Sequence, residues 1–410
     1  MNILFLNGYF YPENTPFTHI ERDILKALVK AGHTVDVICP VPCRGIDEKT
    51  RAEYAHKYEE TLFDGKVRVH RFDLAAEEQS TLKRFLRYIL CDIKEYKIAK
   101  NFKGKGIGAV FAASTPPTQG FLAGKTAKKL GAKCIYNVQD IFPDSLITTG
   151  LSKAGSVLFK IGRVLENSTY ALCDRLIVIS EDGKKNLLGK GVPESKLTVV
   201  NNWIDTDEVK YTEKSVNPIF DEFGIDKNKF TALYAGNLGA SQDIKVIIDA
   251  AKLCEDDENI QFVIFGSGIK EEESKAYAAS VGVKNLVFLP LQPPEKVSAV
   301  YSAGDACIVT CNRGTGKTGV PSKTWSITAC SRPALLSFDK DSDLYRLIDE
   351  NELGLCADAG DKDSLAVNIR RLAGDKALCE ELGKNARSYA EKYASSEVCA
   401  KEYVKVIEGR

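Results

Sequence analysis

The chain has 410 residues, of which 44% are hydrophobic and 27% charged, so it is a globular protein and not a disordered one. Its length favours two domains. Lysine plus arginine and aspartate plus glutamate number 56 each, and the resulting net charge of zero argues against nucleic acid as the main partner.

Cysteines and histidines give no metal-binding pattern. The twelve cysteines are scattered without a C-x-x-C pair, and the four histidines all lie before residue 71. Free thiols in a reducing compartment fit this pattern better than disulfides or a zinc site. No apolar run approaches the roughly 18 residues of a membrane span, and no basic segment with an apolar core precedes the first strand. We therefore expect a cytoplasmic protein.

The first half of the chain alternates predicted strands and helices. Apolar strands are expected at residues 2–6, 34–39, 67–72, 107–112, 133–138, 175–179 and 197–200. A turn-rich loop at residues 12–16 leads into a helix at 17–31, which Gly32 ends. Because a strand, a helix and a strand follow each other at once, the sheet is expected to be parallel. Residues 44–66 are charged and weakly periodic, which indicates a surface excursion.

Three side chains in this half lie where open α/β sheets bind ligands, at the carboxyl ends of strands. His19 is near the loop after the first strand and is either catalytic or an ordinary surface residue of its helix. Ser114 follows the strand at 107–112. Asp140 follows the strand at 133–138, where it could orient a hydroxyl group, accept a proton, or merely cap the next turn.

Residues 83–105 form a basic helix with interspersed aromatic residues. Eight lysines and arginines stand against two acids, with Phe85, Tyr88, Tyr96 and Phe102 among them. Such a helix can lie on an anionic membrane. Alternatively, it packs on the sheet and leaves a solvated basic face.

A second strand–helix series follows residues 206–228, where the apolar pattern lapses and Pro218 indicates a linker. Its strands are expected at residues 230–235, 261–265, 286–289, 306–310 and 334–336. Glycine-rich turns at 236–239 and 266–268 follow two of these strands, and such turns let backbone N–H groups approach phosphates.

The segment Val320-Pro321-Ser322-Lys323-Thr324 predicts the start of a helix between two buried strands. Proline suits a first helical turn, and the two hydroxyl groups can bind free amides there. The positive end of the helix, together with the lysine, predicts a phosphate site. An ordinary crossover helix with a solvated lysine fits the same residues. The preceding residues 314–318 resemble the end of a P-loop, but Cys311 stands where the required glycine would be, so we interpret them as a flexible basic loop.

Several motifs together resemble one known family. They are Ala31-Gly32-His33-Thr34-Val35, the turn at Asp205, Gly236-Asn237-Leu238, Phe265-Gly266-Ser267-Gly268, and Val320-Pro321-Ser322-Lys323 with Arg332-Pro333. Their order and spacing resemble the family 4 glycosyltransferases with the GT-B fold, over nearly the whole chain. The Pro-Ser-Lys helix and residues 140–144 are most similar to the subgroup that builds bacterial surface polysaccharides on lipid-linked acceptors.

The resemblance implies two Rossmann-like, doubly wound parallel-sheet domains facing across a cleft. Residues 1–205 would bind the acceptor, 206–228 would be the linker, 229–384 would bind the nucleotide sugar, and 385–410 would form a helix that crosses back to the first domain. It further implies a retaining, metal-independent hexosyl- or N-acetylhexosaminyl-transferase that needs no cofactor. The donor would carry UDP rather than GDP, and the acceptor would be polyprenyl-diphosphate-linked or an oligosaccharide. Residues 83–105 would contact the inner membrane leaflet.

The resemblance also implies which residues form the site. Lys323 and Asp140 are the expected catalytic residues. The donor is expected to contact Gly236, Asn237, Gln242, Gly266, Ser267, Gly268, Leu291, Arg313, Gly319, Val320, Pro321, Ser322, Thr324 and Ser326. The acceptor is expected to contact Phe17, Thr18, His19 and Ser114.

The chain departs from the family at the diphosphate. Many members carry an Arg and a Lys where this chain has Asn237 and Gln242, and their Glu-x7-Glu pair falls near Thr318 and at Ser326. Lys323, Arg313 and Lys317 are the remaining cations in that region. A non-catalytic GT-B partner subunit therefore stays open as an alternative, and so does a nucleotide-sugar epimerase, which can share two such domains. A dinucleotide oxidoreductase is disfavoured, because Asn7-Gly8 offers no G-x-G-x-x-G motif after the first strand.

Overall fold

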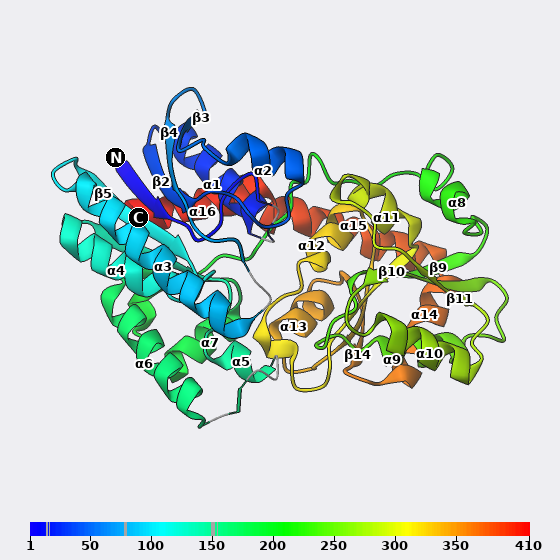
Figure 1. The fold of residues 1–410 in the computed structure, drawn as a ribbon. Helices are drawn as coiled ribbons and strands as arrows, with labels where there is room; N and C mark the ends of the chain where they lie inside the picture. The colour runs from blue at the N-terminus through cyan, green and yellow to red at the C-terminus, as the bar shows by residue number, and fades with distance from the viewer. Residues whose placement is uncertain (14, 16, 78–79, 149–151, 154) are drawn as a thin grey trace. The chain divides into compact units, whose positions relative to one another are not determined.

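The computed structural model describes residues 1–13, 15, 17–77, 80–148, 152–153 and 155–410. The chain divides into two compact units, Met1–Asn201 with Cys399–Arg410, and Asn202–Val398 (Figure 1). Each unit is built on one largely parallel β-sheet. The predicted α/β class with two Rossmann-like domains is confirmed. No helix in the described part of the chain is long and apolar enough to cross a membrane.

The first unit holds an eight-stranded sheet in the order β3-β4-β2-β1-β5-β6-β7-β8. The strands are β1 Asn2–Leu6, β2 Thr34–Pro40, β3 Glu59–Leu62, β4 Val67–Phe72, β5 Ile107–Ala113, β6 Lys133–Val138, β7 Arg175–Val178 and β8 Leu197–Val199. Neighbouring strands are parallel, except that β3 runs antiparallel to β4 at the edge. The strand order reverses at β1, which lies between β2 and β5, and open sheets bind ligands at such a point.

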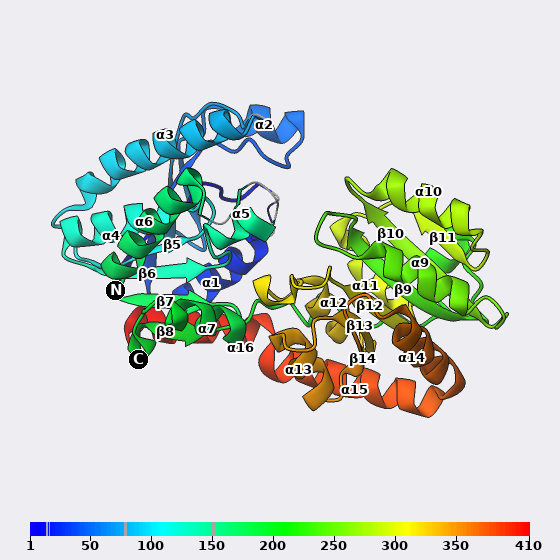
Figure 2. The same cartoon turned by 90° about the horizontal axis from the view of Figure 1, so that it is seen from below.

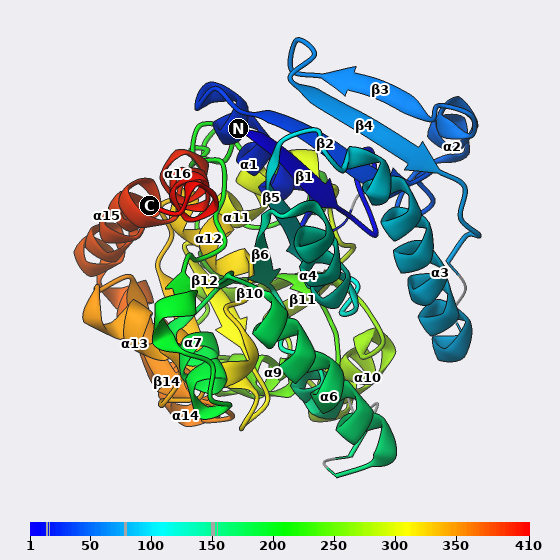
Figure 3. The same cartoon turned by 90° about the vertical axis from the view of Figure 1, so that its left-hand side faces the viewer.

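Helices cover both faces of this sheet (Figures 2 and 3). One face carries α3 (Thr81–Ala99), α4 (Gln119–Leu130) and α6 (Val157–Leu172), and the other carries α1 (Thr18–Lys30) and α16 (Ser396–Glu408). Side chains of β1 alternate between the faces: Leu4 and Leu6 join the core beneath α3 and α4. Phe5 stacks on Phe111 with ring centroids 4.5 Å apart, and Phe111 contacts Tyr403 of α16. The C-terminal helix thus completes the core of the first unit.

Three further helices of the first unit are α2 (Glu48–Tyr54), α5 (Asp144–Thr148) and α7 (Glu181–Gly189).

The second unit holds a six-stranded parallel sheet in the order β11-β10-β9-β12-β13-β14. Its strands are β9 Phe230–Asn237, β10 Ile260–Ser267, β11 Leu286–Leu289, β12 Ala306–Thr310, β13 Ala334–Phe338 and β14 Gly354–Asp358. Here the order reverses at β9, which lies between β10 and β12.

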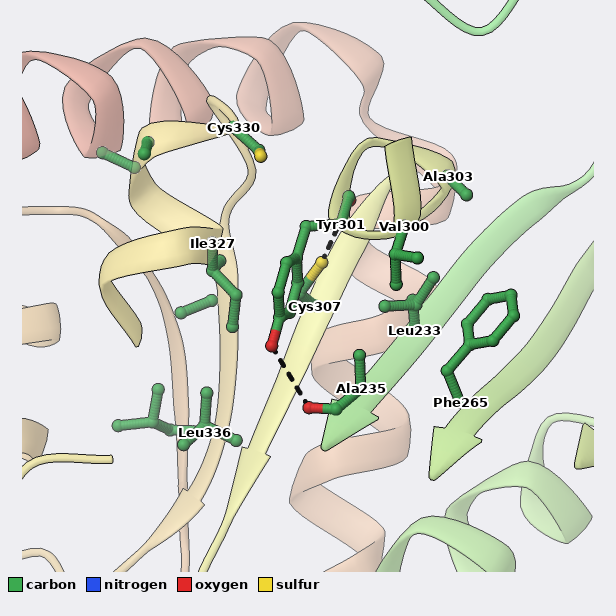
Figure 4. Close-up of a cluster of buried hydrophobic side chains, with 14 of the residues drawn as sticks. Leu233, Ala235, Phe265, Val300, Tyr301, Ala303, Cys307, Ile327, Cys330 and Leu336 are labelled. Atoms are coloured by element: carbon green, nitrogen blue, oxygen red, sulfur yellow. Dashed lines mark hydrogen bonds between the residues drawn. The ribbon is translucent and has the colours of Figure 1, made fainter. Parts of the chain in front are cut away.

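Two hydrophobic clusters join the second sheet to its helices. The first lies under α8 (Pro218–Phe223), α11 (Val297–Ala303), α12 (Lys323–Ala329), α13 (Asp343–Glu350) and part of α15 (Lys376–Tyr393). The second lies under α9 (Ile244–Leu253), α10 (Glu271–Val281) and α14 (Lys362–Gly374). Figure 4 shows the first cluster, in which the Tyr301 hydroxyl donates to the carbonyl oxygen of Ala235 at 3.3 Å. This contact fixes α11 against the carboxyl end of β9.

Three boundaries differ from the sequence-based expectation. Residues 206–228 are not a linker: they belong to the second unit and contain α8, where Pro218 occupies a first-turn position that needs no N–H group. Residues 44–66 contain α2 and β3, and β3 lacks an apolar pattern because it is a charged edge strand. Residues 385–410 are not one helix, because α15 ends at Tyr393 and only Cys399–Arg410 join the first unit.

Candidate active site

The predicted glycine turns meet at the carboxyl ends of β9 and β10. The two strands pair in register, with Gly236 opposite Gly266. The N–H of Leu238 donates to the carbonyl of Ser267 at 2.8 Å, so the two turns are hydrogen-bonded to each other. A Cβ atom at Gly266 would lie 2.8 Å from the Leu238 side chain, and one at Gly268 would lie 2.6 Å from the Leu238 carbonyl oxygen. Both glycines are therefore required by the close approach of these turns.

Lys323 lies beside this pair of turns. It is the first residue of α12, and its Nζ lies 3.5 Å from the centroid of the Tyr234 ring on β9. Gly236 leaves room for the amine, since a Cβ there would lie 3.1 Å from Nζ. The Nζ atom is buried and has no hydrogen-bond partner in the described part of the chain. Burial lowers the pKa of Lys323 to about 7. The described residues thus provide no anionic partner for this amine.

The lowered pKa predicts a pH-dependent stability. An unfolded lysine has a pKa of about 10.4, so between pH 7 and that value the unfolded state binds more protons than the folded state. The free energy of unfolding contributed by Lys323 therefore rises with pH across this window. We expect Lys323→Met to be more stable than the unmodified protein at pH 7 and below, with the difference shrinking toward pH 10. Urea unfolding at several pH values measures it, and a difference independent of pH would contradict the buried amine.

The glycine-rich loop before α12 is held by a carboxylate. Asp339, which follows β13, accepts the N–H of Gly314 at 2.9 Å with Oδ1 and the N–H of Gly316 at 2.7 Å with Oδ2. Two amides that a P-loop would offer to a phosphate are therefore already occupied. This agrees with the interpretation that residues 314–318 are not a P-loop.

The other two predicted cations are engaged elsewhere. Arg313 donates from Nη2 to the carbonyl oxygen of Ala359 at 2.8 Å, and its side chain is 72% exposed. Lys317 pairs with Asp341 on the surface. Of the three cations considered for the diphosphate, the structure places Lys323 beside Gly236.

The helix that carries Lys323 is shorter than expected. It begins at Lys323 and not at Pro321, spans seven residues, and has no side-chain cap from Ser322. Its dipole is correspondingly small, so the charge of the site rests on the lysine. Thr324 is fully buried, and its hydroxyl oxygen has no partner among the described residues.

The remaining predicted donor residues have varied surroundings. The side-chain oxygen of Gln242 accepts the N–H of Gly239 at 3.2 Å and so closes the first turn. Val320 packs against the first hydrophobic cluster, and Ser326 is buried in α12. Leu291 follows the edge strand β11 and is 49% exposed. Asn237 ends β9, and its backbone carbonyl accepts the Tyr234 hydroxyl at 2.7 Å.

In the first unit, Ser114 organises the carboxyl ends of β5 and β6. Its Oγ accepts the N–H of Gln139 at 2.9 Å and the N–H of Asp140 at 3.0 Å. Surrounding protein raises the pKa of the Asp140 carboxyl by desolvation, although the residue retains solvent contact. A raised pKa suits a group that accepts a proton. Ser114 thus positions the loop, and Asp140 is the residue that faces solvent.

The predicted acceptor residues Phe17, Thr18 and His19 lie at the start of α1. The Thr18 hydroxyl donates to the carbonyl oxygen of Glu13 at 2.8 Å, and His19 is exposed. Asn14 and Pro16 of the preceding loop lie outside the described residues.

Two buried carboxylates near this loop were not predicted from the sequence. Glu13 accepts the N–H groups of Cys43 and Arg44, both at 2.9 Å, and joins two loops. Glu21 accepts the Asn7 side-chain amide at 2.5 Å, and burial raises the pKa of Glu21 to about 8. The helical periodicity of the sequence could have predicted the burial of Glu21, because this residue lies on the same face of α1 as the apolar residues that are buried. In the described residues, no group of three or more His, Cys, Asp or Glu could hold a metal ion.

Comparison with known proteins decides the family. Residues 215–389 match the model "Glycosyl transferases group 1", and residues 22–208 match the model "Glycosyltransferase Family 4". The chain belongs to the GT-B glycosyltransferases. The two matched regions of the glycosyltransferase follow each other along the chain, residues 22–208 first and residues 215–389 second.

Three similar proteins extend this comparison. WcaI of Escherichia coli (strain K12), named for colanic acid biosynthesis as a glycosyl transferase, is 25% identical over 419 residues and covers 100% of both chains. Anabaena HepE, solved with UDP and glucose, has a TM-score of 0.71 at 14% identity, with 100% of both chains covered. WaaG, a glycosyltransferase involved in lipopolysaccharide biosynthesis, has a TM-score of 0.68 at 15% identity and the same coverage. At these identities the solved structures establish the fold of the glycosyltransferase and nothing further.

Proposed function

We propose that the glycosyltransferase moves a hexose or N-acetylhexosamine from a UDP-sugar to a lipid-linked or oligosaccharide acceptor in bacterial surface polysaccharide biosynthesis. The anomeric configuration of the sugar is retained, and neither a metal ion nor a cofactor takes part. The second unit binds the donor. The first unit binds the acceptor, with Asp140 in reach of its hydroxyl group.

The buried amine of Lys323 carries this proposal. Its Nζ is enclosed beside Tyr234 and Gly236 without a hydrogen-bond partner in the described chain, at the point where the strand order of the sheet reverses. A diphosphate placed there would raise the pKa of the amine again and pair with the ammonium. The pairing strengthens as the sugar leaves and the diphosphate gains charge, so it lowers the barrier to transfer.

The names of the similar proteins support two parts of the proposal, the nucleotide of the donor and the class of product. HepE was solved with UDP-glucose as well as with UDP, which favours a uridine nucleotide. WcaI is named for colanic acid biosynthesis and WaaG for lipopolysaccharide biosynthesis, which favours a role in polysaccharide biosynthesis.

A nucleotide panel followed by product analysis tests the function. We expect UDP at saturating concentration to raise the melting temperature of the unmodified protein more than GDP or ADP does, and to raise that of Lys323→Met much less. A UDP-sugar with a lipid-linked acceptor should then yield a glycosylated lipid. A changed sugar in the absence of acceptor would indicate an epimerase. UDP binding without transfer to any acceptor tried would indicate a partner subunit without catalytic activity.

We also propose that α3 lies on an anionic membrane surface. Four large apolar side chains of this helix are about half exposed: Phe85 45%, Leu86 51%, Leu90 52% and Ile93 46%. Lysines 83, 94 and 97 are exposed on the same helix. Arg87, which the sequence placed on the basic face, does not belong to it, because it is buried and donates to the carbonyl oxygen of Ala75 at 2.9 Å.

The membrane proposal predicts that Leu86→Gln with Leu90→Gln weakens binding to vesicles containing phosphatidylglycerol by about tenfold or more. The reason is that a leucine gains roughly 1.5–3 kcal/mol when its side chain leaves water, and about half of each side chain is available. Co-sedimentation measures the binding. Val367→Gln is the matched control, since Val367 is 63% exposed on α14 of the other unit and should change nothing. Equal binding by the double variant and the control would contradict the proposal.

A further inference from the structure

One cavity of the glycosyltransferase lies at the opposite end of the second sheet from Lys323. Its volume is about 650 Å³, and it opens at the amino ends of β9, β12 and β13, whereas Lys323 lies at the carboxyl end of β9. The C-terminal end of α14 and the first turns of α15 complete its wall. All of its lining residues belong to the second unit.

The charge of this cavity is strongly one-sided. Six of its lining residues are cations and two are acids: Lys214, Lys227, Lys229, Arg332, Lys376 and Lys384, against Asp305 and Glu380. Positive and negative residues are equal in number over the whole chain, so the cavity concentrates positive charge.

Half of these cations already have acidic partners. Lys214 lies 3.0 Å from Asp305, and Lys227 and Lys376 also have carboxylates within 4 Å. The other three, Lys229, Arg332 and Lys384, have no acidic partner in the part of the chain that the structure describes.

Among these three cations, Arg332 is the one whose side chain is held in place by an aromatic ring. Its guanidinium carbon lies 4.1 Å from the centroid of the Tyr211 ring, and its Nε is buried with no hydrogen-bond partner among the described residues. Ser331, which precedes it, has a φ of +56°, a left-handed conformation that is rare for serine and turns the chain sharply at the end of α12. A stacked, unpaired guanidinium at the wall of a basic cavity has the geometry that binds phosphate oxygens in pairs.

We propose that this cavity binds a small molecule carrying a phosphate or diphosphate group, through Arg332 with Lys229 and Lys384. Its volume lies within the range of ordinary small-molecule sites, about 300–1,000 Å³. Tyr211 and Phe230 supply aromatic surface for the uncharged part of the ligand. The site is separate from that of the sugar donor, so it stands whether or not the proposed function holds.

Calorimetric titration of the full-length chain with inorganic pyrophosphate tests the site. Lys323→Met serves as the background, because it removes the donor-site contact to pyrophosphate. In that background we expect binding to persist, and Arg332→Gln to weaken it at least tenfold. Lys384→Gln, which changes one exposed side chain and cannot disturb the core, should weaken it severalfold. Arg370→Gln is the matched control, since it removes the same charge from the surface of α14 outside the cavity.

Absence of binding to both pyrophosphate and phosphatidic acid vesicles in the Lys323→Met background, or equal binding with Arg332→Gln and Arg370→Gln, would overturn the proposal. A second arm with vesicles containing phosphatidic acid separates the two sources of the phosphate group. Vesicle binding that depends on Arg332, without binding of pyrophosphate, would assign the site to a lipid headgroup. Binding of pyrophosphate alone would assign it to a soluble metabolite.

Discussion

Replacing Lys323 by methionine should lower kcat/KM for sugar transfer by about 30- to 1000-fold, equivalent to roughly 2–4 kcal/mol of transition-state stabilisation. Methionine keeps most of the side-chain volume beside Tyr234 but removes the charge that would meet the leaving diphosphate. Because the amine has no hydrogen-bond partner in the described chain, its removal breaks no internal hydrogen bond, and the protein should stay folded. Initial rates with a UDP-sugar, alongside far-UV circular dichroism, measure both effects.

The matched control for this variant is Lys317→Met. Lys317 lies six positions earlier in the same segment, but it pairs with Asp341 on the surface and not with the glycine turns. Transfer by this variant should remain within a few-fold of the unmodified protein. If Lys317→Met loses as much activity as Lys323→Met, the assignment of the diphosphate contact to Lys323 is wrong.

Replacing Gly236 by alanine should reduce transfer by about 100-fold, since misplacing a catalytic group by about 1 Å has a cost of that size. The new Cβ would lie 3.1 Å from Nζ and 3.2 Å from Cε of Lys323, so the flexible lysine would have to move. The residue also has a φ of +138°, which glycine adopts readily and alanine does not. We therefore expect a stability loss of about 1–3 kcal/mol as well, measured by urea unfolding.

Gly282→Ala is the control that distinguishes the effect of displacing Lys323 from the effect of backbone strain alone. Gly282 ends α10 with a φ of +62°, and an added Cβ there would meet nothing within 4 Å. This variant should lose stability but retain the transfer rate. A Gly236→Ala protein as active as Gly282→Ala would show that room beside Lys323 is not needed.

Most of the fold follows from local patterns in the sequence. Buried strands such as β1 and β9 are short apolar runs flanked by turn residues. Such strands can be predicted from the sequence because a parallel sheet buries both of its faces, so nearly every residue of the strand is apolar. The errors lie where a local signal has two meanings. Pro218 was interpreted as part of a linker, but it is the first residue of α8. The strand β3 was not predicted, because its residues are charged and it lies at the edge of the sheet.

The sequence by itself determined the order of strands and turns, and with it the place of the glycines and of Lys323 at the carboxyl ends of strands. The family resemblance favoured Lys323 as a catalytic residue, but the sequence left open which of Lys323, Arg313 and Lys317 holds the diphosphate. Only the tertiary structure decided between them, because burial and pairing depend on which strands become neighbours. The position of β9 between β10 and β12 brings Tyr234 and Gly236 against Lys323. Asp341, which follows β13, pairs with Lys317, and the carbonyl oxygen of Ala359, which follows β14, accepts from Arg313.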